Sequence, residues 1–149
     1  MKTPREPKAP RVAKRKHPER DIQRGIVALV RRCYPSVLIA AIPNEQAGAS
    51  GDAEARARFG AARKASGVLS GHPDLILYLP GGRTLLLEVK AAAGRVSEAQ
   101  ASLHARLWDM GHPVHVVRSI EDAQAALTRT GAVQEPRFRM AVPVEPLAR

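Results

Sequence analysis

Residues 73–90 read PDLILYLPGGRTLLLEVK, which is two apolar runs joined by a Pro-Gly-Gly loop. Apolar runs of this length on either side of a short glycine-containing loop predict a β-hairpin. The expected strands are Asp74–Leu79 and Thr84–Lys90, with Pro80–Gly82 as the turn. The register of this hairpin decides which side chains meet across the two strands.

Two charged side chains interrupt the second strand of the hairpin. Because side chains alternate along a strand, Glu88 and Lys90 project from one face and the opposite face is apolar. That core-facing row consists of Leu85, Leu87 and Val89. Burying an acid and a lysine in an otherwise apolar strand is unfavourable, which indicates a purpose other than packing.

The length of the hairpin loop sets the partner of each residue. A three-residue loop places Leu79 opposite Arg83, and the same register places Asp74 opposite Glu88. A two-residue loop would instead pair Asp74 with Val89 and would separate the two carboxylates. We expect the three-residue loop, so the candidate site depends on this register.

Asp74 and Glu88 are candidate metal ligands. Directly opposite residues point to the same face, with Cβ atoms about 4.5–5.5 Å apart. Carboxylates this close repel each other strongly unless a cation lies between them. Hard oxygen ligands suit Mg²⁺ or Mn²⁺. Each residue alone also has a structural interpretation, Asp74 as the residue that begins a strand and Glu88 as half of an ion pair with Lys90.

Helix and strand signals continue on both sides of the hairpin. Apolar spacing, prolines and capping residues predict further elements at Pro18–Arg32, Val37–Ile42, Asp52–Lys64, Ser97–Met110, Val114–Val117 and Ser119–Arg129. The second and fifth of these are strands, and the other four are helices. Ser97 and Gln100 have the spacing of a capping box. Together the elements predict one α/β domain, a small mixed sheet flanked by helices.

Positive charge is concentrated at the N-terminus. The 149 residues carry 24 Lys and Arg against 14 Asp and Glu, a formal net charge of +10, and seven of the basic residues fall within residues 1–16. We expect residues 1–17 to form a flexible basic arm, residues 18–130 the domain, and residues 131–149 an extended tail. The arm either binds phosphates through counterion release or serves only solubility. Its candidate DNA-binding residues are Lys14, Arg15 and Lys16.

Composition also excludes several classes of protein. Cys33 is the single cysteine, so an intrachain disulfide or a cysteine-based zinc site is excluded. The longest apolar runs are too short to cross a bilayer, and the basic N-terminus leads into no apolar signal segment. We therefore expect a cytoplasmic protein, of a bacterial or phage-infected cell.

Aromatic residues are only 3% of the chain. Proteins that bind single strands by stacking need aromatic side chains, so this composition favours binding to backbone phosphates over stacking on single-stranded bases.

The charged residues of the hairpin resemble the signature of the PD-(D/E)XK nuclease superfamily. The matching positions are Pro73-Asp74 and then Glu88-Val89-Lys90. The flanking sequence is similar to the VRR-NUC (virus-type replication-repair nuclease) family over roughly Glu19 to Leu127. The segments that carry this similarity are KASGVLSGHPDL (64–75), LEVK (87–90), GRVSEAQ (94–100), Glu19 with Ile22-Gln23, and Ile42-Pro43-Asn44.

The resemblance implies a restriction-endonuclease-like core in the order α-β-β-β-α-β and a metal-dependent phosphodiesterase. At the family's positions, Asp74 and Glu88 would hold Mg²⁺, with Mn²⁺ as a substitute and the Val89 carbonyl as a further ligand. Lys90 would orient or deprotonate the attacking water and offset charge on the phosphate. Glu19 would reach the metal directly or through water. The same resemblance implies that Gln100 supports the site or touches the phosphate, although its capping role also explains it.

The resemblance also implies DNA as the partner, either branched or duplex. The helix of residues 52–64 presents basic side chains that could line the DNA path, and an ordinary solvated basic helix is the alternative. Stand-alone members of the family resemble homodimeric nucleases that cut four-way junctions, and neither a membrane nor a small-molecule cofactor is expected. The alternatives are a flap or nicking nuclease without junction preference, or a non-catalytic DNA-binding module of the same fold. The candidate DNA-binding residues of the domain are Arg56, Arg63, Lys64 and Arg95.

Overall fold

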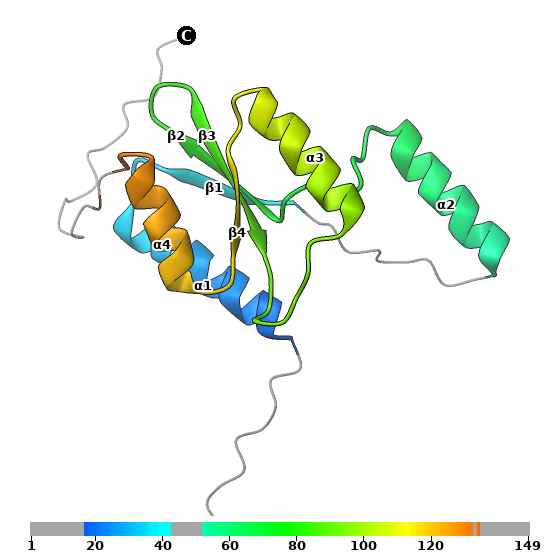
Figure 1. The fold of residues 1–149 in the computed structure, drawn as a ribbon, viewed down its shortest axis with the longest axis horizontal. Coiled ribbons are helices and arrows are strands. Elements are labelled where there is room, and N and C mark those ends of the chain that lie inside the picture. The colour runs from blue at the N-terminus through cyan, green and yellow to red at the C-terminus, as the bar shows by residue number, and fades with distance from the viewer. Residues whose placement is uncertain (1–16, 43–51, 133, 135–149) are drawn as a thin grey trace, which may run out of the picture.

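A four-stranded sheet forms the centre of the molecule (Figure 1). The structure is a computed structural model, and it describes residues 17–42, 52–132 and 134. Its elements are α1 (Pro18–Cys33), β1 (Leu38–Ala41), α2 (Ala53–Ala65), β2 (Leu75–Leu79), β3 (Arg83–Val89), α3 (Glu98–Asp109), β4 (Val114–Val117) and α4 (Ile120–Arg129). Residues 1–16 of the expected basic arm and nearly all of the expected tail lie outside the described residues.

The sheet is mixed, as predicted. Its strand order is β1-β2-β3-β4, which follows the order along the chain. The pairs β1–β2 and β2–β3 are antiparallel, whereas β3 and β4 are parallel. Because parallel neighbours need a crossover connection, α3 lies between β3 and β4 in sequence. The predicted fold class, a small mixed sheet flanked by helices with a restriction-endonuclease-like order of elements, is confirmed.

The hairpin has the predicted register. Leu79 pairs with Arg83, and the pairing continues without interruption to Leu75 opposite Leu87. The three-residue loop is possible because Gly81 and Gly82 have φ angles of +80° and +72°, a region that glycine enters readily. The next position beyond the last pair therefore brings Asp74 level with Glu88.

The hydrophobic core lies between the sheet and two helices, α1 and α4. Ile26 and Val30 of α1 and Leu127 of α4 are fully buried. They pack against the predicted apolar row of β3 and the matching row of β2. That packing holds the sheet rigid from one side and leaves its other face for α3. The apolar residues contributed by the hairpin are Leu75, Leu77, Leu79, Leu85, Leu87 and Val89.

The two remaining helices lie on the other side of the sheet (Figure 1). α3 packs beside β4, so the β3 face that carries Leu86 and Glu88 is buried. α2 stands away from the sheet and buries none of its residues. Its sequence explains this position, because Ala and Arg dominate it and its side chains form no apolar stripe.

The helix boundaries follow the predicted capping residues. Asp52 caps α2 by accepting a hydrogen bond from the Ala55 N–H at 2.8 Å. Ser97 and Gln100 form the complete capping box of α3. Ser119 caps α4 in the same manner by accepting from the Asp122 N–H at 3.1 Å. Across the described residues, the helices lack the length and apolar character that a membrane crossing requires.

Candidate active site

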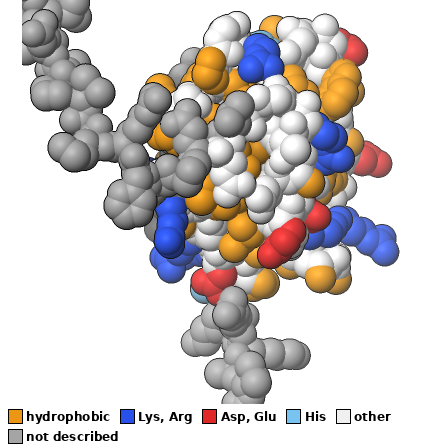
Figure 2. Space-filling model, turned by 90° about the vertical axis from the view of Figure 1, so that its left-hand side faces the viewer, with side chains coloured by type: hydrophobic (Ala, Val, Ile, Leu, Met, Phe, Trp, Pro, Cys, Tyr) orange, Lys and Arg blue, Asp and Glu red, His pale blue; other side chains and the backbone are white. Residues whose placement is uncertain are grey.

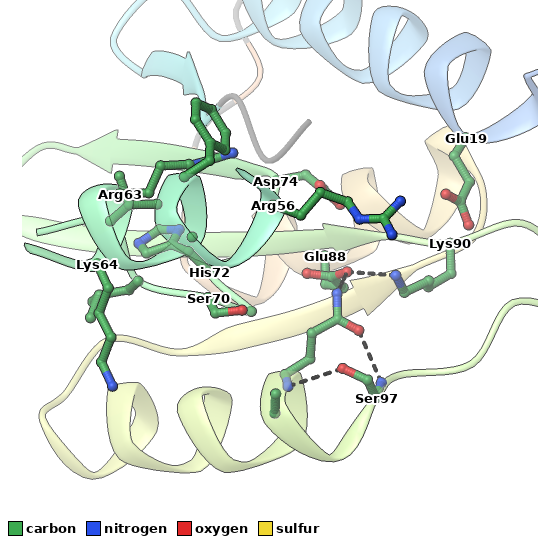
Figure 3. Close-up of a pocket in the computed structure, with 17 residues that line it drawn as sticks. Glu19, Arg56, Arg63, Lys64, Ser70, His72, Asp74, Glu88, Lys90 and Ser97 are labelled. Carbon is green, nitrogen blue, oxygen red and sulfur yellow. Dashed lines mark hydrogen bonds and ion pairs between the residues drawn. The ribbon is translucent and has the colours of Figure 1, made fainter. Parts of the chain in front are cut away.

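A cleft of about 800 Å³ lies between α2, α3 and the sheet (Figure 3). Five residues that the sequence nominated for catalysis line it, although they come from α1, the position before β2, the end of β3 with the residue that follows it, and α3. The register of the hairpin and the crossover through α3 thus bring distant parts of the chain together. The five residues are Glu19, Asp74, Glu88, Lys90 and Gln100.

Asp74 is fixed at the edge of the hairpin by both its backbone and its side chain. Its backbone carbonyl accepts a hydrogen bond from the Ile42 N–H at 2.8 Å, which ties it to the residue after β1. Its Oδ2 accepts from the Val89 N–H at 2.8 Å. The carboxylate is therefore held across the strands beside Glu88, as the register predicts.

Glu88 and Lys90 form a buried ion pair. The Lys90 Nζ lies 2.8 Å from the Glu88 Oε1, and the two side chains are only 14% and 1% exposed. The Lys90 backbone N–H donates to the Val117 carbonyl at 3.0 Å, so the end of β3 is anchored to β4. Removing either partner of such a pair leaves a buried charge unpaired, which is strongly unfavourable.

The surroundings raise the pKa of both members of this pair. Burial raises the pKa of Glu88, and the negative charges of Asp74 and Glu19 add to it, while Lys90 opposes the shift. Burial lowers the pKa of Lys90, but the carboxylates of Glu88, Glu19 and Asp74 outweigh it and leave the pKa raised. The positive charge of Lys90 is therefore stabilised by three acidic side chains.

Gln100 serves the site and the helix at the same time. Its Oε1 accepts a hydrogen bond from the Ser97 N–H at 2.9 Å, which closes the capping box. Its Nε2 donates to the Glu88 Oε1 at 2.5 Å. The two roles that the sequence left as alternatives thus coincide, and the start of α3 positions the carboxylate of Glu88.

Glu19 reaches the site from the first turn of α1. Its Oε1 accepts a hydrogen bond from the Ala91 N–H at 3.0 Å, directly after Lys90. Gly94 passes close by, since a Cβ at that position would lie 3.2 Å from the same oxygen. Glu19 therefore anchors the segment that follows β3, a structural role that the sequence did not indicate. Its predicted contact with a metal remains a prediction.

His104 is a site residue that the sequence analysis missed. It lies one turn after Gln100 on α3, and its Nε2 is 3.6 Å from the Glu88 Oε2. Burial lowers the pKa of His104, and the nearby charge of Lys90 lowers it further. The four-residue spacing from Gln100 is the signal that could have found it, because residues four apart share one face of a helix.

Gly71 brings the loop before β2 against the start of α3. Its φ is +81°, and a Cβ there would lie 3.0 Å from the Ala99 carbonyl and from the Gln100 backbone. Only glycine allows the two backbones to approach so closely in this conformation. This contact connects the loop that leads to Asp74 with the helix that carries Gln100 and His104.

Basic side chains form the α2 side of the cleft. Arg56, Arg63 and Lys64 line it. Arg56 extends its guanidinium toward the end of the cleft that holds Lys90 (Figure 3). The Arg63 guanidinium lies over the Phe59 ring, 5.8 Å from its centre.

The other predicted DNA-binding residues are not placed in the cleft. Arg95 is exposed on the connection between β3 and α3 and is not among the described residues that line the cleft. Lys14, Arg15 and Lys16 lie outside the described residues. On the side of the molecule that α1 and α4 cover, basic and acidic side chains are interspersed (Figure 2).

The donor groups of the cleft fit a hard divalent cation. Two facing carboxylates, Asp74 and Glu88, lie beside a third acid, and the Glu88 Oε2 is buried without a hydrogen-bond partner among the described residues. Within those residues, no three His, Cys, Asp or Glu side chains are already arranged as a metal cage. Backbone carbonyls and water would therefore complete the coordination of an ion held by these two carboxylates.

Comparison with known proteins agrees with the geometry. The VRR-NUC domain matches residues 19–121. The chain belongs to the VRR-NUC family. This VRR-NUC match places the chain in a nuclease family and spans all five cleft residues that the sequence nominated, from Glu19 to Gln100.

Two solved structures share the VRR-NUC fold with this chain. One, described as a VRR_NUC domain, is 21% identical with a TM-score of 0.50, and the match covers 75% of this chain and 95% of the other. A second, described as a VRR_NUC domain protein, is 19% identical with a TM-score of 0.56. This match covers 78% of this chain and 89% of the other. No curated protein matches the chain.

Proposed function

We propose that this VRR-NUC protein is a Mg²⁺-dependent endonuclease that hydrolyses phosphodiester bonds in DNA. The observation that carries the proposal is the convergence of Asp74, Glu88 and Lys90 in one cleft. Two carboxylates beside an ammonium group can bind a divalent cation and an anionic phosphate together. We propose that it acts in the cytoplasm of a bacterial or phage-infected cell.

Asp74 and Glu88 would hold the cation, with the Val89 carbonyl as a further ligand and Glu19 as a candidate for direct or water-mediated contact. Mn²⁺ would replace Mg²⁺, because both prefer oxygen ligands. Once bound, such a cation supplies charge stabilisation at the phosphate and lowers the pKa of water. Gln100 positions the Glu88 carboxylate for this purpose through the hydrogen bond from its Nε2.

Lys90 would act on the phosphate and the attacking water. It would orient or deprotonate the attacking water and offset charge on the scissile phosphate, and its ammonium lies 2.8 Å from the Glu88 Oε1. Its backbone is fixed to Val117, and Glu19 holds the next residue, Ala91. These anchors restrict the ammonium to the acidic end of the cleft.

The finer proposal is a structure-specific enzyme that acts as a homodimer on branched DNA such as a four-way junction. A two-fold dimer would present two clefts to two symmetry-related strands. The arginines of α2 support a partner that is rich in phosphates, because they line the same cleft as the acidic residues. α2 buries none of its own residues, so its surface is open to such a partner.

A panel of end-labelled substrates tests the proposed function. The full chain is incubated with duplex, nicked, flap, splayed and four-way DNA in Mg²⁺, in Mn²⁺ and in EDTA, and its mass is measured by light scattering. We expect cleavage that requires a metal and is fastest on the four-way junction, from a dimer. Equal cutting of flaps or nicks would overturn the junction preference. Binding without any metal-dependent cutting would indicate a non-catalytic module of the same fold.

Arg56 is expected to contribute to DNA binding through phosphate contact. Arg56→Ala should weaken binding and reduce the slope of log affinity against log salt by about one. The matched control is Arg58→Ala, which removes the same charge from the same helix at an exposed position outside the cleft lining. The measurement is fluorescence anisotropy over a series of salt concentrations. Identical slopes for the two variants would show that α2 contributes only general charge.

A further inference from the structure

An exposed apolar patch forms part of the cleft wall. It consists of Phe59 of α2 together with Val68 and Leu69 of the loop that follows α2, and all three residues line the cleft. They are 38%, 42% and 55% exposed. Single apolar residues on a surface are ordinary, but a group of them in a concave site indicates a ligand with an apolar surface of its own.

The apolar patch lies at the end of the cleft opposite Lys90. Arg63 and Lys64 mark that end (Figure 3). The centre of the Phe59 ring lies 5.8 Å from the Arg63 guanidinium. The Val68 N–H donates a hydrogen bond to the Arg63 carbonyl at 3.0 Å, which folds the loop back onto the end of α2. The patch is therefore a defined part of the wall.

One face of α2 combines the aromatic ring with positive charge. The residues of α2 that line the cleft have the spacing of a single helix face, and they are Arg56, Phe59, Gly60, Arg63 and Lys64. A Cβ on Gly60 would meet nothing within 4 Å, so the space beside the ring is open. Glycine is unfavourable inside a helix, and among the described residues no close neighbour accounts for its presence here.

A nucleotide whose base has left the stack fits this combination of groups. Arginines suit its phosphates, and an exposed aromatic ring suits the flat face of its base. In a continuous duplex the neighbouring bases cover these faces, whereas a branch point or a single-stranded arm exposes them. The low aromatic content of 3% argues against a run of stacked bases, but one ring is enough for one base.

We propose that Phe59 stacks on an unstacked base of the substrate and thereby selects branched DNA over continuous duplex. The inference rests on the proposed function and deepens it by naming a residue that determines the substrate class. A second copy of this chain is the other candidate occupant of the patch. The basic side chains around the ring and the net charge of +10 favour a polyanion over such a copy.

DNA binding by the full chain tests this inference. The ligands are a four-way junction and a continuous duplex of equal length, in EDTA so that the DNA stays intact. Phe59→Ala removes the ring, and Phe59→Trp retains an aromatic face. The matched control is Trp108→Ala, which removes an exposed aromatic side chain of α3 outside the cleft lining. Anisotropy over a salt series measures affinity, thermal melting checks folding, and light scattering measures mass.

We expect Phe59→Ala to weaken junction binding by about tenfold or more and to leave duplex binding unchanged. The slope of log affinity against log salt should keep its wild-type value, because stacking releases no counterions. Phe59→Trp and the control should bind both DNAs as the wild type does. Unchanged junction affinity in folded Phe59→Ala, or an equal loss on both DNAs, would overturn the inference. A fall in mass would also overturn it, by assigning the patch to a contact between copies.

A side chain added beside the ring provides an independent test. Gly60→Leu fills the open space, and Ala61→Leu adds the same side chain at an exposed position outside the cleft lining. We expect Gly60→Leu to lose junction affinity as Phe59→Ala does, while Ala61→Leu binds as the wild type. Equal affinities of these two variants for the junction would contradict a base bound at this place.

The substrate panel separates this outcome from the proposed function. Metal-dependent cutting by an enzyme whose junction affinity is independent of Phe59 would refute the stacking and leave the nuclease assignment intact. Junction binding that depends on Phe59 in a protein that cuts no DNA would refute the nuclease and support the stacking.

Discussion

A Lys90→Met variant is expected to cut DNA at least about 10³-fold more slowly than the wild type. Methionine keeps the approximate length of the side chain and removes the ammonium that lies 2.8 Å from the Glu88 Oε1. The charge that would stabilise the phosphate during attack is then missing, while the α2 arginines proposed to bind DNA are unchanged. In the folded variant, the loss should therefore appear in the rate of the chemical step and not in affinity, and thermal melting measures the separate destabilisation from the unpaired Glu88 charge.

Single-turnover cleavage and anisotropy measure these two quantities separately for Lys90→Met. Lys64→Met is the matched control, because Lys64 lines the same cleft from α2 without pairing with Glu88. We expect this control to cut at nearly the wild-type rate once DNA is saturating. A Lys90 variant that cuts as fast as the control would show that its ammonium has no part in the reaction.

Gly71→Ala is expected to destabilise the domain by roughly 2–5 kcal/mol and to disable the site. The left-handed conformation at φ +81° costs an alanine about 1–2 kcal/mol. Its Cβ would also lie 3.0 Å from the backbone of Ala99 and Gln100, and crowding of this kind adds about 1–3 kcal/mol. Relief of that crowding moves α3, so Gln100 and His104 leave their positions beside Glu88.

Gly67→Ala provides the control for the Gly71 prediction. Gly67 has a similar φ of +86°, but a Cβ there would meet nothing within 4 Å. The Gly67→Ala substitution should therefore lower the free energy of unfolding only by the cost of the left-handed conformation, about 1–2 kcal/mol. Urea unfolding measures the difference in stability between the two variants, and their cleavage rates are measured in parallel. Equal destabilisation would mean that the approach of Gly71 to α3 contributes nothing.

The sequence predicted those parts of the fold that local chemistry determines. Pro80–Gly82 specified the hairpin loop, and from that loop the facing of Asp74 and Glu88 followed by alternation along the strands. The capping residues Ser97 and Ser119 marked where α3 and α4 begin. These signals act over a few residues, so they can be interpreted without knowledge of the tertiary structure.

The sequence could not show contacts that depend on how the elements pack. The spacing of four residues places His104 on the same helix face as Gln100, but the sequence does not show that this face of α3 lies beside Glu88. Glu19 bonds to Ala91, 72 positions away, through the packing of α1 on the sheet. Arg95 is a candidate DNA-binding residue from the sequence, and its position outside the cleft lining of the described residues depends on how the connection between β3 and α3 folds.

The most direct test of the central claim is the metal dependence of cleavage in one assay. The wild type and Asp74→Asn are incubated with an end-labelled four-way junction in Mg²⁺ and, separately, in EDTA. If Asp74 and Glu88 hold the catalytic ion, only the wild type in Mg²⁺ yields cut strands. Equal cutting by the wild type in EDTA, or by the asparagine variant in Mg²⁺, would contradict a metal centre built on these two carboxylates.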